Sequence, residues 1–477
     1  MYINPYIFRN YDIRGVVGKD LDAEKVEALG KAYGTLLNRR KIKQAVVGRD
    51  GRLSSDEFQK AFVKGLITTG VDVIDIGLIM TQMMYFAQYY YQTNGGAMLT
   101  ASHNPAQYNG FKLAIGYSKT TEADELQEMR EYVENDKYFV SPVPGTITKG
   151  DVKAAYIKDL QKRIHFNKKF KVVVDAHHGT TSIYAPEILR LFGCEVVERY
   201  TTVDGAFPAG TPDPTDEHIM LNLAEVVKEE KADVGFAYDG DGDRIGVVDN
   251  NNHIIWNDVL LAIFAKDILE RFPKSKIVYN TLCTQVIPQV VKANGGIPVI
   301  WKTGHAYIKS KIAEEKAVFG GELSGHFFFN DNAFGHDDGI YATLRLLEIL
   351  TEKNMALNEL YSSFPSYISS PEVKVGCADE EKIKIVHEVA KQFRADFPNA
   401  QITDDTVIPG DDGTRADYDD GMIVFRYSQN GPYITVKFEA KDQETYQKRK
   451  EYVRTILEKY PQIVWEDELC VNVNVLK

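Results

Sequence analysis

Three segments of the chain repeat one pattern of apolar and polar positions. Each begins with a short run rich in valine and isoleucine, passes through a polar loop into an amphipathic stretch, and meets a glycine before a second apolar run. The amphipathic stretches predict helices near residues 56–67, 185–192 and 287–293. A strand, helix, strand order implies parallel strands with a right-handed crossover, and glycine commonly follows a helix end. We therefore predict three related α/β domains. The alternative is that these segments are unrelated, because any α/β protein contains similar strand, helix, strand patterns.

The remainder of the chain has a different pattern. After a stretch marked by Pro365 and Pro371, a helix is predicted at 380–393, followed by a turn-rich segment, DDGTRADYDDG. Two short strands, MIVFRYS and YITVKFEA, and a final helix at 443–459 complete an α+β region. We interpret this region as a fourth domain. The predicted domains are residues 1–150, 151–250, 251–367 and 368–477.

Composition narrows the class of protein. A chain of 477 residues is long enough for about three or four domains. The net charge of −12 argues against a general nucleic-acid binder, but a local basic cleft could still bind an anionic substrate. The four cysteines lie far apart without a CxxC pair, so neither a disulfide framework nor a zinc site is indicated. The start, MYINPYIFR, is not typical of a signal peptide, and no apolar run approaches about 18 residues, so we predict a cytoplasmic protein without a membrane partner.

The hexapeptide DGDGDR at 239–244 directly follows an apolar run. It spaces Asp239, Asp241 and Asp243 two apart with only glycine between them. Such a loop can turn all three carboxylates toward one hard cation, for which Mg²⁺, Ca²⁺ and Mn²⁺ are candidates. The alternative is a solvated acidic turn. The sixth and twelfth positions hold Arg244 and Asn250, so an EF-hand is excluded, and carboxylates beside an arginine indicate phosphoryl chemistry.

A second motif, TASHNP at 100–105, follows an apolar run that predicts a buried strand. Ser102 stands at the predicted strand exit, beside His103 and before a proline that constrains the turn. A serine in that place is exposed and able to react. The alternative is an ordinary turn, because serine, asparagine and proline are common turn residues.

These motifs, together with FRNYDIRG at 8–15 and GGELSGH at 320–326, resemble in order the α-D-phosphohexomutase superfamily, and most of all its phosphomannomutase/phosphoglucomutase branch. The resemblance covers nearly the whole chain. It implies an α/β fold of three related mixed α/β domains of the phosphoglucomutase type and a C-terminal α+β domain like the TATA-binding protein, arranged around a central cleft.

The resemblance also implies a reaction. The family's phosphorylated serine, here Ser102, donates its phosphoryl group to a hexose phosphate and recovers one from the bisphosphosugar. The enzyme would be an isomerase that interconverts hexose 1- and 6-phosphates, with Mg²⁺ on the three aspartates and the phosphoserine, and with hexose 1,6-bisphosphate as activator. Lys112 of NGFK is implied as general acid/base, and for that role neighbouring cations such as Arg14 would have to lower its pKa. His326 is a second acid/base or phosphate-contacting candidate, with an ordinary core or surface histidine as the alternative, and His103 would orient the serine loop.

Substrate contacts are implied at four loops. Glu322 and Ser324 would bind sugar hydroxyls, with His305 of WKTGH as a further contact. Tyr11 and Arg14 would lie near the serine, and Arg244 beside the metal loop, where it could instead pair with an aspartate of its own motif. The last loop is the family's phosphate clamp, whose residues here are Arg426, Ser428, Gln429 and Asn430.

Two departures from the family pattern bear on the substrate. The family clamp has the pattern RxSNTEP, and this chain has RYSQNGP, so that Gln429, Asn430 and Gly431 replace Asn, Thr and Glu. Backbone N–H groups and the two amides can still cradle an anion. Leu282 occupies a position where the bifunctional branch typically has a lysine, which removes one basic contact.

Three functions remain open at this point. The first is a Mg²⁺-dependent phosphomannomutase/phosphoglucomutase. The second is a phosphoglucosamine mutase, against which Leu323 stands, because that branch usually has glutamine in GEQSGH. The third is a non-catalytic sugar-phosphate-binding protein, disfavoured by the intact Ser102, Lys112 and aspartates. The expected partners are small hexose phosphates, and a monomer and a dimer both remain possible.

Overall fold

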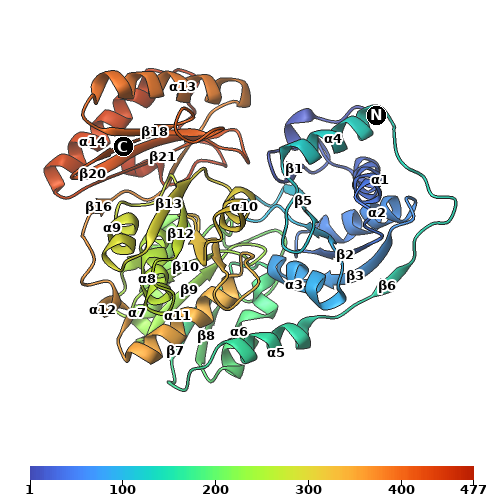
Figure 1. Ribbon diagram of the computed structural model, residues 1–477, viewed down its shortest axis with the longest axis horizontal. Helices are drawn as coiled ribbons and strands as arrows, with labels where there is room; N and C mark the ends of the chain where they lie inside the picture. Colours follow the sequence, from blue (N-terminus) through green and yellow to red (C-terminus); the bar gives the residue numbers. More distant parts are fainter. The chain divides into compact units, whose positions relative to one another are not determined.

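The computed structural model describes residues 1–477, and the chain divides into two compact units (Figure 1). Each unit is formed from three segments. Unit 1 consists of Met1–Asp213, Phe236–Ile245 and Asn332–Thr351. Unit 2 consists of Pro214–Gly235, Gly246–Asp331 and Glu352–Lys477.

A six-stranded mixed sheet forms the first half of unit 1. Its order is β1 (Ile13–Val16), β5 (Tyr108–Ile115), β4 (Gly95–Leu99), β2 (Gln44–Arg49), β3 (Asp72–Leu78) and β6 (Ile147–Lys149). Strand β2 pairs in parallel with β3 and β4, while β5 is antiparallel to β4 and β1. Parallel strands share their carboxyl-end edge, so the loops after β2 and β4 lie at the same edge of this sheet.

Helices cover both faces of this sheet. Helices α1 (Ala23–Arg39), α2 (Ser55–Ile67) and α4 (Ala123–Glu134) share one core with Ala45 and Val47 of β2, whereas Val46 is buried outside that core. Successive strand residues face opposite sides, so this alternation defines two buried faces. Helix α3 (Thr81–Tyr91) contacts β2 and β4. The predicted crossover helix at 56–67 is confirmed as α2.

The second predicted repeat is also observed. Strands β7 (Lys171–Asp175) and β8 (Glu195–Arg199) pair in parallel, and α6 (Ala185–Leu191) connects them. Gly193 follows the helix with φ of +87°, a left-handed conformation that glycine adopts without steric cost. The other regular elements assigned to unit 1 are η1 (Pro5–Ile7), α5 (Lys153–Arg163), η2 (Thr180–Ile183) and α11 (Gly339–Lys353, in unit 1 through Thr351).

Two further strands have residues in both units. They are β9 (Val234–Tyr238) and β10 (Ile245–Val248), and the DGDGDR loop between them lies wholly in unit 1. In unit 2, β10 pairs antiparallel with β11 (Ile254–Ile255).

Unit 2 contains the third repeat. Its four-stranded sheet has the order β13 (Ile297–Trp301), β12 (Lys276–Asn280), β14 (Phe319–Gly321) and β15 (Phe327–Phe329), with β12 parallel to β13 and β14. The predicted helix at 287–293 is confirmed within α9 (Val286–Ala293). The other helices of this part are α7 (Glu217–Glu230), α8 (Asn257–Arg271), α10 (His305–Glu315) and α12 (Leu357–Leu360). The loops after β12, β13 and β14 share one edge of the sheet.

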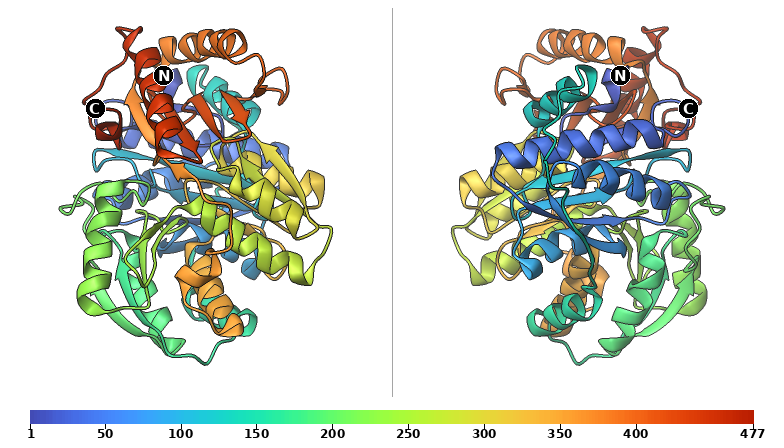
Figure 2. Two further views of the ribbon diagram at one scale, coloured as in Figure 1. Left: turned by 90° about the vertical axis from the view of Figure 1, so that its left-hand side faces the viewer. Right: turned by 90° about the vertical axis from the view of Figure 1, so that its right-hand side faces the viewer.

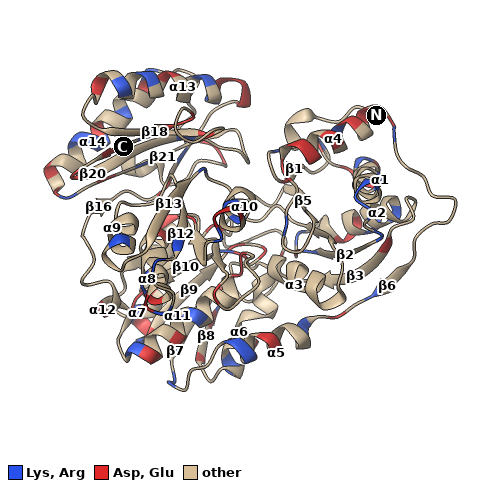
Figure 3. Cartoon of the chain, viewed as in Figure 1, with Lys and Arg blue, Asp and Glu red and all other residues tan.

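The C-terminal part of unit 2 is α+β, as predicted. Its sheet follows the order β16 (Ile368–Ser369), β21 (Tyr433–Ala440), β20 (Gly421–Tyr427), β19 (Gly413–Tyr418) and β18 (Gln401–Asp404), and β17 (Val373–Gly376) also pairs with β21. Helices α13 (Asp379–Asp396) and α14 (Gln443–Glu458) pack on it, and η3 (Val473–Leu476) ends the chain (Figures 1 and 2). Both acidic and basic residues are spread along these two helices (Figure 3), as on solvated helix faces.

One prediction for this region was wrong. The segment DDGTRADYDDG was expected to be turn-rich, but residues 413–418 form β19, paired on both sides. Asp and Gly at the ends of the segment are typical turn residues. They masked a short strand in which core-facing and outward-facing residues alternate and Ala416 faces the core. In none of the helices is there a stretch both long and apolar enough to cross a membrane.

Candidate active site

The DGDGDR loop follows β9, in which every residue is buried, and its glycines permit close approach of other chain segments. A Cβ on Gly240 would lie 2.5 Å from the carbonyl oxygen of Ser102. Gly242 has φ of +79°, and a Cβ there would lie 2.5 Å from Thr181 Oγ1. The motif therefore needs glycine for its contacts as well as for its turn.

Asp239, Asp241 and Asp243 are completely buried, and one oxygen of each lies within 4.8 Å of the others. Oδ1 of Asp241 is buried without a hydrogen-bond partner. Burial, followed by the charge of Asp241, raises the pKa of both Asp239 and Asp243 to about 7. Three oxygen ligands, an unsatisfied buried oxygen and crowded negative charge fit a hard divalent cation.

Neighbouring residues hold the acidic loop in place. The Thr81 hydroxyl donates to Asp241 Oδ2 at 2.6 Å, and its N–H donates to the Asp241 carbonyl. The Gln82 amide donates to the Gly242 carbonyl at 2.9 Å. Both residues lie in the first turn of α3, so the helix start is fixed against the loop. Nothing in the sequence pattern of α3 indicated this role.

Ser102 lies in the loop after β4 and contacts the acidic loop. Its hydroxyl donates to Asp239 Oδ2 at 2.6 Å, and His103 Nδ1 lies 3.2 Å away. The backbone of Ser102 has φ of +49°, a conformation that non-glycine residues adopt mainly where the surroundings impose it. The structure therefore brings together the DGDGDR and TASHNP motifs.

An arginine that sequence reasoning missed fixes the serine loop. Arg52, 2 % exposed, donates hydrogen bonds to the carbonyls of Ser102, Asn104, Pro105 and Tyr108. It follows β2, whose parallel neighbour β4 leads into the serine loop. The GRDGR segment after the first predicted strand was the available signal, because loops after parallel neighbours meet at one sheet edge.

Lys112 is buried and lies against the acidic loop. Its Nζ donates to Asp241 Oδ2 at 2.8 Å and also to Asp243 Oδ2. Burial alone would lower the pKa of Lys112, but Asp241 and Asp243 outweigh it and raise the pKa well above its usual value. The expectation that Arg14 lowers this pKa is wrong. Arg14 instead pairs with Asp12 at 2.8 Å and donates to Asn104 Oδ1 at 2.8 Å.

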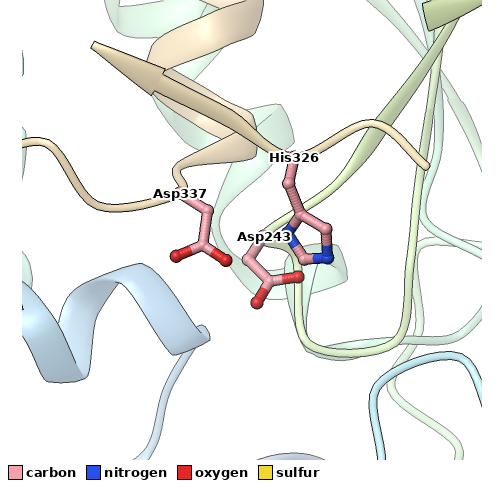
Figure 4. A group of neighbouring side chains, drawn as sticks. All are labelled: Asp243, His326 and Asp337. Atoms are coloured by element: carbon pink, nitrogen blue, oxygen red, sulfur yellow. The ribbon is translucent and has the colours of Figure 1, made fainter. Parts of the chain in front are cut away.

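Other residues complete this part of the site. Arg244 donates to Asp239 Oδ2 at 3.0 Å and lies 3.7 Å from Asp213, so it does pair with an aspartate of its own motif. Tyr11 is buried. Asp337, which sequence reasoning missed, is fully buried with its carboxylate beside Asp243 (Figure 4), and its charge helps to raise the pKa of Asp243.

In unit 2, the GELSGH motif forms a tight turn between β14 and β15. The Glu322 N–H donates to the His326 carbonyl at 3.0 Å, and Gly325 has φ of +96°. Glu322 is 1 % exposed, and its Oε1 accepts the Gly304 N–H at 2.7 Å. His305 begins α10, and its ring centroid lies 5.5 Å from that of His326. The predicted sugar contacts Glu322 and His305 therefore lie close to the acid/base candidate His326, while Ser324 is half-buried on the same turn.

The RYSQNGP segment connects β20 to β21. Arg426 donates through Nε and one Nη to the two oxygens of Asp412, and Gln429 donates to the same carboxylate at 3.1 Å. Ser428 Oγ accepts the N–H groups of Asn430 and Gly431 at 3.0 and 3.1 Å. Asp412 was not among the residues predicted from the sequence. The side chains of Arg426, Ser428 and Gln429 thus already have partners within the loop or at Asp412, whereas Asn430 Oδ1 is buried without one.

Comparison with known proteins decides the family. Models of the phosphoglucomutase/phosphomannomutase alpha/beta/alpha domains I, II and III match residues 5–139, 154–252 and 256–367. The chain belongs to this family. The resemblance inferred from the motifs is confirmed, and so is the fold class: three phosphoglucomutase/phosphomannomutase domains followed by a fourth, with mixed sheets.

Members of the phosphoglucomutase/phosphomannomutase family match along almost the whole chain. A phosphomannomutase/phosphoglucomutase of Pseudomonas aeruginosa is 40% identical over 451 residues, which are 94% of this chain and 95% of that protein. A phosphoglucomutase of Neisseria gonorrhoeae is 34% identical, covering 96% and 98% of the two chains. The crystal structure of a family protein from Burkholderia thailandensis superposes with a TM-score of 0.85 at 34% identity, covering 96% and 98%.

Proposed function

We propose that this protein is a Mg²⁺-dependent phosphomannomutase/phosphoglucomutase, an isomerase that moves a phosphoryl group between the 1- and 6-positions of a hexose. The activity follows the names of its full-length relatives. The observation that carries the assignment to residues is the 2.6 Å contact of Ser102 with Asp239, inside a group of buried carboxylates that also binds Lys112.

In the proposed reaction, the P–O bond to Ser102 Oγ breaks as a sugar hydroxyl oxygen bonds to the same phosphorus, and the hydroxyl proton passes to a base. In the second half, Ser102 Oγ recovers a phosphoryl group from the other end of the bisphosphosugar. Asp239, Asp241 and Asp243 would hold the Mg²⁺ ion, which supplies neutralisation of phosphoryl charge. Arg244, held by Asp239, adds a fixed positive charge near Ser102, at 3.5 Å from its Oγ.

Lys112 is the proposed acid/base. With Asp241 and Asp243 as partners it is an ammonium group, because their charges raise its pKa. In that form it can protonate a sugar oxygen that leaves phosphorus. To accept a proton, Lys112 must first lose its own proton, which requires that the charges of Asp241 and Asp243 are neutralised. The same two carboxylates therefore control whether Lys112 acts as an acid or as a base. His326 and His103 stay proposals as the second acid/base group and the residue that orients Ser102.

Tyr11, Arg14 and Arg244 of unit 1 are proposed substrate contacts, and unit 2 supplies the others. Glu322, Ser324 and His305 would bind sugar hydroxyls, and Arg426, Ser428, Gln429 and Asn430 the phosphate that is not transferred. A hexose 1,6-bisphosphate is the proposed activator because it recharges Ser102. The proposed location is the cytoplasm, which cell fractionation tests, and sedimentation decides between monomer and dimer.

Coupled assays with mannose 1-phosphate and glucose 1-phosphate, in the presence of Mg²⁺ and a bisphosphate activator, test the activity. We expect turnover of both, and no turnover of either would refute the proposal. Glucosamine 6-phosphate belongs in the same series, because a higher kcat/KM for it would transfer the assignment to a phosphoglucosamine mutase. Intact-mass measurement of a phosphoryl adduct that hexose phosphate discharges separates an enzyme from a binding protein.

A further inference from the structure

Asn280 is the last residue of β12, the strand that lies between β13 and β14, and it is fully buried. Its side chain makes three hydrogen bonds. Oδ1 accepts the Leu323 N–H at 3.2 Å and the Cys283 thiol at 2.8 Å, and Nδ2 donates to Thr303 Oγ1 at 3.0 Å. One side chain therefore joins the three loops that follow β12, β13 and β14.

Two of these loops carry the proposed sugar contacts. Leu323 lies between Glu322 and Ser324, and Thr303 precedes His305 by two residues. A direct bond from the Gly304 N–H to Glu322 Oε1, at 2.7 Å, also connects the two loops. The second connection passes from Thr303 through Asn280 to Leu323. With one bond alone the loops could pivot about it, and the second connection fixes their relative orientation.

We propose that Asn280 is a positioning residue for hexose recognition, which sets the placement of Glu322 relative to His305. The proposal rests on the proposed function, because it takes these two residues as contacts to the sugar ring. An amide is suited to the place because it donates on one side and accepts on the other without charge. A carboxylate would have no donor for Thr303 and would bury a negative charge, and an alanine would leave the Leu323 N–H unsatisfied.

The consequence is selective. All three side-chain hydrogen bonds of Asn280 go to residues outside the RYSQNGP loop, so we expect its loss to affect binding of the sugar ring and to leave phosphate recognition unchanged. For Asn280→Ala we expect kcat/KM for hexose 1-phosphates to fall about tenfold or more, since small displacements of positioning groups are costly. The ratio of kcat/KM for glucose 1-phosphate to that for mannose 1-phosphate should change about threefold, because hydroxyl contacts decide such ratios.

The test measures kcat/KM for glucose 1-phosphate and for mannose 1-phosphate, the ratio of these two values, and the inhibition constant of inorganic phosphate. We expect that constant to stay within about twofold of wild type, since the clamp is untouched. An equal loss of sugar turnover and of phosphate inhibition would overturn the proposal, because it would show general damage to unit 2. Unchanged kcat/KM values with an unchanged sugar ratio would overturn it as well.

Two further variants keep the test decisive. Asn294→Ala is the matched control, because Asn294 is a half-buried asparagine at the end of α9 that donates only to the Val290 carbonyl at 2.8 Å. Thr303→Val removes the partner of Nδ2 alone and should reproduce the change in sugar ratio, and the double variant with Asn280→Ala should be no worse than Asn280→Ala. Thr303→Val decides the matter if Asn280→Ala fails to fold.

The failure of this inference is distinguishable from the failure of the proposed function. A wild-type protein that turns over no hexose phosphate refutes the function. A wild-type protein that turns over hexose phosphates, with Asn280→Ala and Thr303→Val behaving as wild type, refutes only the positioning role.

Discussion

The acidic loop of unit 1 is proposed to bind a cation and the RYSQNGP loop of unit 2 a phosphate. The charged side chains of the two loops differ in how far they are already neutralised. The acidic loop gathers three buried carboxylates, and Asp241 Oδ1 has no hydrogen-bond partner. In the RYSQNGP loop, Arg426 and Gln429 are held by Asp412, and Ser428 accepts the nearby N–H groups. In the acidic loop, Lys112 and Arg244 face three carboxylates and leave Asp241 Oδ1 without a partner, whereas in the RYSQNGP loop Asp412 neutralises the charge of Arg426.

The difference shows that a sequence motif identifies which charged and polar groups are present, but not whether other residues have already paired with them. An unsatisfied buried carboxylate oxygen is costly and favours a cation, so the acidic loop gains from binding. A phosphate at Arg426 must compete with a carboxylate already bound to the same guanidinium fork. We therefore expect changes in unit 1 to have larger effects on activity than changes at the clamp.

The largest effect is expected for Ser102→Ala. Without the hydroxyl that faces Asp239 there is no phosphoryl carrier, and we expect activity to fall about 1,000-fold or more. Coupled assays measure this, and intact mass should show no phosphoryl adduct. Ser141→Ala is the matched control, because the side chain of this half-buried serine hydrogen-bonds only the backbone of Val143. Retention of activity by Ser102→Ala would remove the nucleophile assignment.

Asp241→Asn should have the next largest effect. It removes the charge at the centre of the acidic loop and one of three ligand oxygens, so we expect affinity for Mg²⁺ or Mn²⁺ to fall about 100-fold. Calorimetric titration of the metal measures this independently of activity. Chelation of the wild-type protein should stop turnover, and added Mg²⁺ should restore it. Equal metal affinity in variant and wild type would contradict the cation site.

At the clamp we expect a smaller change in the opposite direction. Asp412→Asn keeps one acceptor for Arg426 but removes the competing charge, so inorganic phosphate should bind about threefold to tenfold more tightly. Titration with phosphate checks this, and Arg426→Ala provides the reference for a lost clamp. If Asp412→Asn binds phosphate more weakly, Asp412 orients the arginine instead of competing for it, and the contrast between the two loops fails.

The smallest expected effect concerns stability and pH. Burial raises the pKa of Asp338 to about 7, and the Tyr156 hydroxyl and Tyr341 N–H donate to its carboxyl group. The folded state therefore holds this proton more tightly than the unfolded chain, so the stabilisation is complete below about pH 4 and is lost as the pH rises toward 7. The melting temperature of Asp338→Asn should fall less between pH 4.5 and 8 than that of the wild-type protein. Identical pH profiles of melting temperature would contradict this.

Much of the fold could be predicted because its signals are local. The strand, helix, strand repeats were found from apolar runs and glycines, and Gly193 and Gly295 do take left-handed conformations after their helices. The segment that became β19 was missed because its strand is short and flanked by turn residues, although it pairs with β18 and β20, its neighbours in the chain. Pairing between strands is decided by packing, which local composition does not contain.

The residues that support the site were harder to find than those that form it. The regular spacing of Asp239, Asp241 and Asp243 identified them in the sequence, and Ser102 was identified by its place after a predicted strand. Arg52, Thr81, Asp412 and Asn280 act through contacts with distant segments, and their own surroundings in the sequence are ordinary. The error about Lys112 has the same origin, because its pKa depends on which charges lie beside it.

By itself, the sequence determined the family, the three repeats, and the chemistry available at each loop, because these depend on residue types and short spacings. Only the tertiary structure decided which charges are paired: Lys112 with Asp241 and Asp243 instead of under the influence of Arg14, and Arg426 with Asp412. The physical reason is that electrostatic and hydrogen-bond energies depend on distance and burial in space. Residues far apart in the chain become neighbours only after folding.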